Sequence, residues 1–423
     1  MIFYEILFLI FTIMPVIWNF LQVYYFLKSN SIKSKNEITN SNNHKSFSFI
    51  IAEKNEREET IDDLFKNLLD LDYDDYEIII VSDDPPEIFE KKYEKYKNIS
   101  RVKVVNRTNP KGKKSGALNY GISLAKYQYL VFLDVDARVE KDFLKKLSEY
   151  ECDLLALKLR IYNAQTQVQK YYREFAEKVM DSLFKVRYYL GLPIFPNGSA
   201  LCVKKDTLIK LGGWKEDLIT EDLELGIRAF LNGYNIKYVD NIVVYSLAPF
   251  TLNDLYSQIQ RWSYGSAQLF FTSLKMLKKG MKGIEGFLYS QQWGIYGLFV
   301  FAISLFSAFN FILKIPASIY LLSIILYGLS LGLYSLVYKT NVNDIKLPIV
   351  LLNASISGYI KGLFKFPFSW RVTPKIKDDE KTNEEKTNFI IPIILLFSFI
   401  NMIEGQLLAS LILLFISVME SVV

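Results

Sequence analysis

Two aspartates follow an apolar segment of the chain. Asp134 and Asp136 come directly after "YLVFL" (129–133), a run typical of a buried strand. Alternate residues of an extended chain point the same way, so the two carboxylates repel each other unless a cation lies beside them. Mg²⁺ and Mn²⁺ prefer oxygen ligands, and Mg²⁺ is often shared with substrate phosphates. The pair therefore indicates a metal and diphosphate site, although two solvated turn carboxylates would give the same pattern.

Further acids follow two earlier predicted strands. Asp83 and Asp84 come after "YEIIIV" (76–81), and Glu56 ends the polar "EKNE" that follows "SFSFII" (46–51). A carboxylate at a strand end can accept a hydrogen bond from a ribose hydroxyl or a base N–H, whereas a simple Asx turn is the alternative. Because ligands of parallel sheets bind beyond the carboxyl ends of the strands, we expect all these acids at one edge.

A basic stretch precedes a predicted helix. Lys114 lies in "NPKGKKSGALNYG" (109–121), which resembles a phosphate-binding loop, but Arg107 stands where that motif requires its first glycine. Lysines before a helix start can still contact a phosphate. A solvated basic turn fits equally well.

Two later segments also carry chemically useful side chains. Glu221 and Asp222 follow Thr220, a predicted helix cap, so they either stabilise the helix dipole or supply a general base. Gln258, Arg261 and Trp262 are spaced to share one helical face. A guanidinium suits phosphates and an indole suits a sugar ring, whereas anchoring at a membrane interface is the alternative.

Composition narrows the class of protein. The 423 residues are 51% hydrophobic and 22% charged, a mixture that predicts a soluble part and a membrane part. The net charge of +5 is too small to indicate nucleic acid binding. A single histidine, His44, and two cysteines argue against histidine catalysis and a disulfide framework, so carboxylates must carry any acid–base chemistry.

The elements that would position these residues alternate in type. Strand-like runs at 46–51, 76–81, 101–105 and 129–133 are separated by helix-like segments. This alternation predicts an α/β fold, a mostly parallel sheet with helices on both faces.

Taken in chain order, the motifs resemble those of the membrane-bound family 2 glycosyltransferases, the cellulose, hyaluronan and chitin synthases and their relatives. They are N-E at 55–56, D-D at 83–84, "KKSGALN", D-x-D at 134–136, T-E-D at 220–222 and Q-x-x-R-W at 258–262. The resemblance extends over residues 46–375 and includes "FSWRVTPK" (368–375), which is similar to a gating loop of the processive synthases.

The resemblance implies a GT-A fold and a role for each motif. Asp83 would contact uridine, and Asp134 and Asp136 would hold the metal and the diphosphate. Asp222 would be the base, with Glu221 beside it. The other implied residues are Glu56, Asp84 and Lys114 for the donor, Gln258, Arg261 and Trp262 for the acceptor and diphosphate, and Trp370, Val372, Thr373 and Lys375 for the gating loop. One departure is Ser246, which stands where an acid is common.

The apolar runs divide the chain further. We expect the following segments: a transmembrane helix (1–28), a linker (29–45), a cytosolic catalytic domain (46–270), an interfacial helix region (271–290), two transmembrane helices (291–339), an interfacial or membrane helix (347–366), a cytosolic gating-type loop (367–387) and a C-terminal transmembrane hairpin (388–423). Lys28, Lys33 and Lys35 after the first helix predict that this end faces the cytoplasm.

The expected protein is a multi-pass enzyme of the cell membrane. It would transfer a sugar from a UDP-sugar to a glycan acceptor with inversion, using Mg²⁺ or Mn²⁺, in the manner of a polysaccharide synthase. A single transfer to a lipid carrier is one alternative, and a sugar-nucleotide sensor or a transport protein is a more distant one. No nucleic acid partner is expected.

Overall fold

The computed structural model describes residues 2–32, 44–151, 153–339, 346–368 and 390–421. The chain forms two compact units. The sheet unit comprises Lys28–Phe250 and Phe271–Phe287, and the helical unit comprises Met1–Leu27, Thr251–Phe270 and Leu288–Val423. Trp370, Val372, Thr373 and Lys375 of the predicted gating loop lie outside the described residues.

The sheet unit is built on one eight-stranded sheet in the order β3-β2-β1-β4-β7-β6-β8-β5. The first four strands are parallel, as the alternating sequence pattern predicts. Beyond β4 the sheet is mixed, because β7 pairs antiparallel with both β4 and β6, whereas β6 and β8 are parallel. The strands are β1 (Phe47–Glu53), β2 (Tyr76–Ser82), β3 (Val102–Asn106), β4 (Tyr129–Phe132), β5 (Arg138–Val139), β6 (Leu154–Ile161), β7 (Leu201–Lys204) and β8 (Lys237–Ser246).

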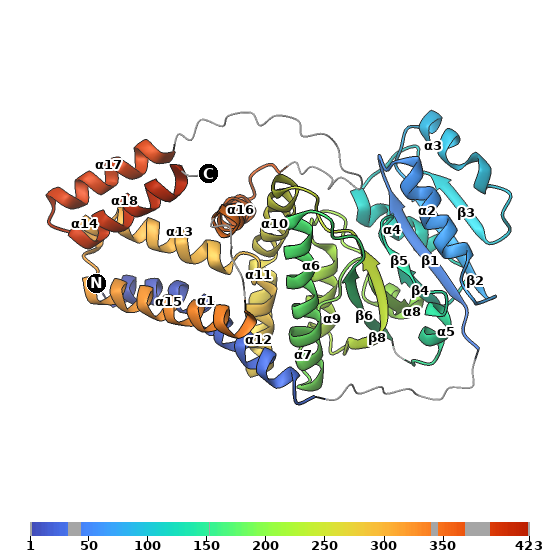
Figure 1. Ribbon diagram of the computed structural model, residues 1–423, viewed down its shortest axis with the longest axis horizontal. Helices are drawn as coiled ribbons and strands as arrows, with labels where there is room; N and C mark the ends of the chain where they lie inside the picture. The colour runs from blue at the N-terminus through green and yellow to red at the C-terminus, as the bar shows by residue number, and fades with distance from the viewer. Residues whose placement is uncertain (1, 33–43, 152, 340–345, 369–389, 422–423) are drawn as a thin grey trace. The chain divides into compact units, whose positions relative to one another are not determined.

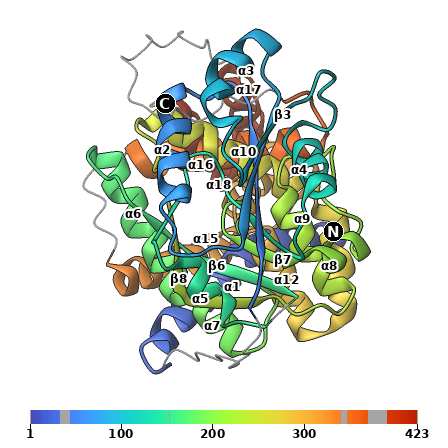
Figure 2. The same ribbon diagram turned by 90° about the vertical axis from the view of Figure 1, so that its right-hand side faces the viewer.

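Helices cover both faces of this sheet, as predicted (Figure 2). Alternate residues of β1 point to opposite faces. Phe49 and Ile51 join a buried core with Leu64 and Leu68 of α2. Ile50 points the other way, where a Cβ on Gly121 of α4 would lie 2.6 Å from its Cγ2. This glycine therefore allows α4 to pack closely on the sheet.

The remaining elements of the sheet unit follow the same alternation. They are α2 (Glu58–Leu69), α3 (Pro86–Tyr93), η1 (Glu94–Tyr96), α4 (Lys113–Leu124), α5 (Phe143–Ser148), α6 (Gln167–Val179), η2 (Met180–Phe184), α7 (Lys185–Tyr189), α8 (Lys205–Lys210), α9 (Glu221–Leu231), η3 (Leu274–Lys279) and α12 (Met281–Ser290). Of these, η2 is a π-helix.

Within the described residues, the helical unit contains two helices that are long and apolar enough to cross a membrane. They are α1 (Ile2–Ser29) and α15 (Ala317–Tyr338), which run alongside each other in Figure 1. Thr12 lies 3.1 Å from Ser323, and Asn19 donates to Ser330 at 3.0 Å. Both partners advance by seven residues, so the two helices are parallel.

Shorter helices complete the helical unit. They are α10 (Leu252–Gln268), α13 (Ile295–Ala308), α14 (Asn310–Leu313), α16 (Lys346–Leu363), α17 (Ile390–Ile403) and α18 (Leu407–Ser421), whereas the short α11 (Phe270–Ser273) has only its first residue in this unit. Helix α16 packs closely on α10, since Gln260 donates to Ser357 at 2.8 Å and Ser263 donates to the Ser355 carbonyl at 2.7 Å. The membrane segments expected from the sequence remain predictions.

Candidate active site

The parallel strands bring the predicted acids to one edge of the sheet. Asp83 and Asp84 follow β2, and Asp134 and Asp136 follow β4. The segment after β1 reaches across to β2, because the N–H of Asn55 donates to Asp84 Oδ1 at 2.6 Å. Asn55 adopts a left-handed backbone with φ of 59°, a conformation that asparagine tolerates better than most residues.

Arg107 joins the end of β2 to the basic loop before α4. Its guanidinium binds both carboxylate oxygens of Asp83, at 2.6 Å and 2.5 Å. It also donates to the carbonyls of Lys111 at 2.8 Å and Lys113 at 3.1 Å. The sequence analysis noted Arg107 only as the residue that breaks a phosphate-loop motif. Its position directly after β3, the strand beside β2, is the signal that points to Asp83.

Asp84 belongs to a closed cluster with Glu53 and Lys92. The ammonium of Lys92 lies 2.5 Å from Asp84 and 3.1 Å from Glu53. Ser82 and the N–H of Glu56 donate to the Glu53 carboxylate at 2.5 Å and 2.9 Å. Burial raises the pKa of Glu53, with a further contribution from Asp84, although these hydrogen bonds and Lys92 oppose the shift.

Lys114 is the centre of a second, more open cluster. Its ammonium lies 2.6 Å from Asp134 and 3.5 Å from Glu221, so it links the end of β4 to the start of α9. Burial alone would lower the pKa of Lys114, but the charges of Asp134 and Glu221 raise it above its usual value. Burial also raises the pKa of Glu221, and the neighbouring Asp222 adds to that shift while Lys114 opposes it.

Asp222 is oriented by backbone N–H groups. Gly198 donates to its Oδ2 at 2.9 Å and Leu223 donates to its Oδ1 at 2.7 Å. A Cβ on Gly198 would lie 3.3 Å from Oδ2, so a larger residue at this position would crowd the carboxylate. Thr220 stands at the N-cap position of α9, but its side chain makes no capping hydrogen bond. The predicted role of Thr220 as a side-chain cap is therefore wrong.

Asp136 is buried and held by the segment after β8. Ser246 Oγ and the N–H of Leu247 both donate to its Oδ2 at 3.2 Å. This contact gives a physical account of the departure from the family pattern at position 246. A second acid there would face the Asp136 carboxylate, whereas serine offers a hydrogen-bond donor.

The chemistry of Asp134 and Asp136 fits a divalent cation with oxygen ligands. Within the described residues, no group of three or more histidine, cysteine, aspartate or glutamate side chains gathers into a ready-made metal site. The protein would thus supply one or two carboxylates, and substrate phosphates and water the rest. Mg²⁺ is commonly bound in this way.

A further set of contacts fixes α4 and α9 relative to the loop at 211–214. Asn119 of α4 exchanges two hydrogen bonds of 2.9 Å with the backbone of Trp214. Arg228 of α9 donates to the carbonyls of Leu211 and Gly213 and pairs with Glu224. The two helices that carry Lys114 and Glu221 are therefore braced by one loop.

The predicted acceptor residues lie on α10 in the helical unit. The ring of Trp262 lies 4.5 Å from that of Trp293. Gln258 Oε1 is buried without a hydrogen-bond partner, and Arg261 has no ion pair within the part of the chain that the structure describes. Gln258 and Arg261 thus have unused hydrogen-bonding capacity.

Comparisons with known proteins agree on the family. The profile for Glycosyl transferase family group 2 matches residues 129–336, and that for Glycosyl transferase family 2 matches residues 48–205. A probable glycosyltransferase of Sulfolobus acidocaldarius is 30% identical over 381 residues, covering 82% of this chain and 80% of the relative. The poly-beta-1,6-N-acetyl-D-glucosamine synthase of Staphylococcus aureus is 28% identical over 274 residues, covering 62% of this chain and 66% of the relative.

A solved structure shares the fold. The mannosyltransferase of Pyrobaculum calidifontis, determined with GDP-Man and Mn²⁺, superposes with a TM-score of 0.57 at 16% identity and covers 85% of this chain and 100% of its own. This likeness supports the predicted GT-A fold. The chain belongs to the family 2 glycosyltransferases, since the profiles and the 30% identical relative agree. It is therefore a transferase, and the reading as a transport protein is set aside.

Proposed function

We propose that the chain is a membrane-embedded, inverting glycosyltransferase that moves a sugar from a UDP-sugar to a growing glycan, in the manner of a polysaccharide synthase. The observation that carries this proposal is the open cluster, in which Lys114 joins Asp134 to Glu221 beside Asp222. The similarity to the poly-beta-1,6-N-acetyl-D-glucosamine synthase supports a glycan product.

Asp222 is proposed as the general base. Backbone N–H groups hold its carboxylate, and its side chain is less buried than that of Glu221. It would take the proton from an acceptor hydroxyl as that oxygen attacks the anomeric carbon. The bond to the nucleoside diphosphate breaks on the opposite face, which inverts the configuration. General base assistance of this kind contributes about 10²–10⁴-fold to the rate.

The donor side is proposed to use residues at the strand ends. Asp134 and Asp136 would hold Mg²⁺ or Mn²⁺, which supplies positive charge against the departing diphosphate. Lys114 would contact the same diphosphate. Asp83 would meet the base as one half of its pair with Arg107. Asp84 and Glu56 would form the bottom of the donor site, because the Asp84 carboxylate and the Glu56 N–H already make contacts within the closed cluster.

The acceptor side is proposed to use α10. Arg261 would contact phosphate oxygens, Trp262 would stack on a sugar ring, and Gln258 would accept a hydrogen bond at its unpartnered Oε1. These three roles, and that of the gating loop with Trp370, are carried over from the family resemblance.

The contacts in the helical unit support a topology. Lys28 at the end of α1 favours the cytoplasmic side, and α15 runs parallel to α1, so it would end there too. Asn401 donates to the Ala308 carbonyl at 3.1 Å, and Asn310 donates to Gln406 at 2.8 Å. The turn between α17 and α18 would therefore lie at the outer end of α13.

Thiol labelling tests this topology. In intact cells, a membrane-impermeant maleimide should label Glu404→Cys and Ile2→Cys but not Lys28→Cys. Labelling of Lys28→Cys alone would reverse the proposed orientation.

A donor screen tests the activity. Purified full-length protein is incubated with radiolabelled UDP- and GDP-sugars and Mg²⁺ or Mn²⁺, and the product is sorted into water-soluble polymer and organic extract. We expect a UDP-sugar to yield labelled polymer. Label only in the organic extract would indicate single transfer to a lipid, and no turnover of any donor would refute the proposed function.

A further inference from the structure

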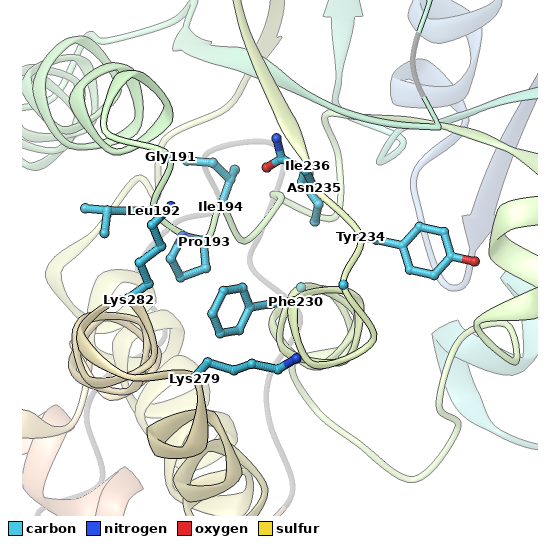
Figure 3. Close-up of a pocket in the computed structure, with 12 residues that line it drawn as sticks. Gly191, Leu192, Pro193, Ile194, Phe230, Tyr234, Asn235, Ile236, Lys279 and Lys282 are labelled. Atoms are coloured by element: carbon cyan, nitrogen blue, oxygen red, sulfur yellow. The ribbon is translucent and has the colours of Figure 1, made fainter.

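A cavity of about 300 Å³ lies in the sheet unit at the end of α9 remote from Asp222 (Figure 3). Helix α9 has 11 residues, so its two ends are roughly 16 Å apart. The walls combine polar and apolar groups, and Figure 3 shows the ring of Phe230 facing Pro193 across the cavity, with Leu192 and Ile194 beside it. The cavity is therefore separate from the catalytic carboxylates.

Two lysines line the cavity from the segment 274–287. Lys279 ends η3 and Lys282 lies in the first turn of α12. A Cβ on Gly191, whose φ is +62°, would lie 3.2 Å from Lys282 Nζ, so the ammonium closely approaches this glycine. Within the described residues, no carboxylate pairs with either lysine. The cavity thus combines two unneutralised cations with an apolar wall.

The lysines are not needed to cap α9. The N–H of Gly233 donates to the Phe230 carbonyl at 3.1 Å, and the N–H of Tyr234 donates to the Ala229 carbonyl at 2.9 Å. The backbone itself therefore satisfies the end of this helix.

The stretch 271–284, which includes both lysines, exposes large apolar side chains. Phe271 is 69% exposed and Met281 is 79% exposed, and Leu277 and Ile284 are exposed as well. Apolar residues combined with lysines are typical of a helix lying in the headgroup layer of a membrane. An amphiphilic anion from that layer matches both the charge and the apolar wall of the cavity.

The cavity is mechanically connected to Asp222. Buried Arg187 pairs with Glu285 of α12 and donates to the carbonyl of Pro193. Pro193 begins the loop that leads to Gly198, whose N–H orients Asp222. The loop and α9 each have one end at the cavity and the other at the catalytic base.

We propose that this cavity binds the phosphate headgroup of an anionic membrane lipid through Lys279 and Lys282, with the start of its acyl chains on Leu192, Pro193 and Phe230, and that the bound lipid fixes the 193–198 loop that holds Asp222. The inference rests on the membrane location in the proposed function. It adds a lipid site outside the donor and acceptor sites.

The test compares two double variants of the full-length protein in nanodiscs. Lys279→Gln/Lys282→Gln changes the cavity, and Lys275→Gln/Lys278→Gln removes the same charge from the same segment outside the cavity. Lipid affinity is measured by quenching of tryptophan fluorescence with a headgroup-labelled phosphatidylglycerol in phosphatidylcholine. A hydrogen bond between an ammonium and a phosphate contributes about tenfold to affinity, so the cavity variant should bind about a hundredfold more weakly, whereas the control loses only the general attraction of the anionic surface and should bind more tightly than the cavity variant.

The outcomes separate the sources of the phosphate and the two proposals. Equal loss in both variants would overturn the cavity site in favour of a diffuse basic surface. Inorganic phosphate that competes as well as the lipid would overturn the lipid assignment in favour of a free anion. Donor turnover by the wild type should rise with phosphatidylglycerol content, and turnover that is independent of it would overturn the link to Asp222. Because lipid affinity is read without a sugar donor, a chain that binds lipid but turns over no donor would contradict only the proposed function.

Discussion

Two lysines at the same edge of the sheet each join two carboxylates, and the two clusters differ in exposure. Lys92 lies between Glu53 and Asp84, whose side chains are 0% exposed, and is itself 10% exposed. Lys114 and Asp134 are 36% and 37% exposed, and Glu221 is 9% exposed. The closed cluster satisfies its charges internally, whereas the open cluster leaves carboxylate and ammonium groups accessible to a ligand.

The comparison shows that similar charged side chains can serve stability in one place and ligand binding in another. A buried charge is costly unless it is paired and hydrogen-bonded, and the closed cluster meets that condition with Ser82 and the Asn55 backbone. An exposed pair contributes little to stability because water screens it. The open cluster is therefore free to exchange its internal pairs for a charged ligand. Loss of a residue should reduce stability in the closed cluster and activity in the open one.

The largest effect is expected next to the open cluster. Asp222→Asn removes the proposed base and keeps the size of the side chain, so turnover should fall about 10²–10⁴-fold. The melting temperature should stay within a few degrees of the wild type. Asp206→Asn is the matched control, because Asp206 is also an acid in the first turn of a helix, α8. If Asp222→Asn turned over donor at the wild-type rate, the assignment of the catalytic site to the open cluster would be wrong.

The next effect belongs to the closed cluster. Lys92→Gln leaves Glu53 and Asp84 buried without their cation, which should reduce the free energy of unfolding by about 3–5 kcal/mol. Denaturant unfolding, followed by tryptophan fluorescence, measures this loss. The protein that stays folded should retain turnover within about threefold, a margin expected when no transition-state contact is lost. A stable Lys92→Gln protein without activity would mean that the closed cluster also takes part in catalysis.

The sequence predicted the position of the acids but not their separation into a closed and an open cluster. Strand ends are visible as apolar runs followed by polar residues, so Asp83, Asp84, Asp134 and Asp136 could be assigned to one edge. Their partners come from distant segments, and a single sequence does not reveal such pairing. Lys92 was not singled out in the sequence analysis, although it is buried in the structure.

The second half of the sheet could not be predicted from the sequence either. The sequence analysis assigned no strand after residue 133, because strands such as β5 and β7, which are two and four residues long, give little periodicity. Their antiparallel pairing is set by tertiary contacts, such as those of Cys202 with Leu155 and Val131. The pairing of β5 with β8, which sets Arg138 opposite Tyr245, brings Ser246 close to Asp136, 110 residues away in the chain.

A third, smaller effect distinguishes the two lysines directly. Lys114→Gln should lower kcat/KM for the donor about 10–100-fold, because a hydrogen bond to a charged group contributes about 1.5–3 kcal/mol. The loss should appear mainly as a raised KM for the donor if Lys114 contacts the diphosphate in the ground state. Lys111→Gln is the control, since its exposed side chain lies in the same loop. If Lys114→Gln were destabilised but fully active, the open cluster would have a structural role, as the closed cluster around Lys92 does.

The smallest effect is a change in the pH dependence of stability. Burial raises the pKa of Glu53, so the folded state holds this proton more tightly than the unfolded state does. Its contribution to stability is fully present below the ordinary glutamate pKa of about 4.3 and is lost as the pH rises through the raised value. Glu53→Gln cannot ionise, so its melting temperature relative to the wild type should rise as the pH increases from about 4 toward neutrality. The opposite trend would mean that Lys92 and Ser82 affect the pKa of Glu53 more than burial does. The ion pairs of the closed cluster would then stabilise the folded protein.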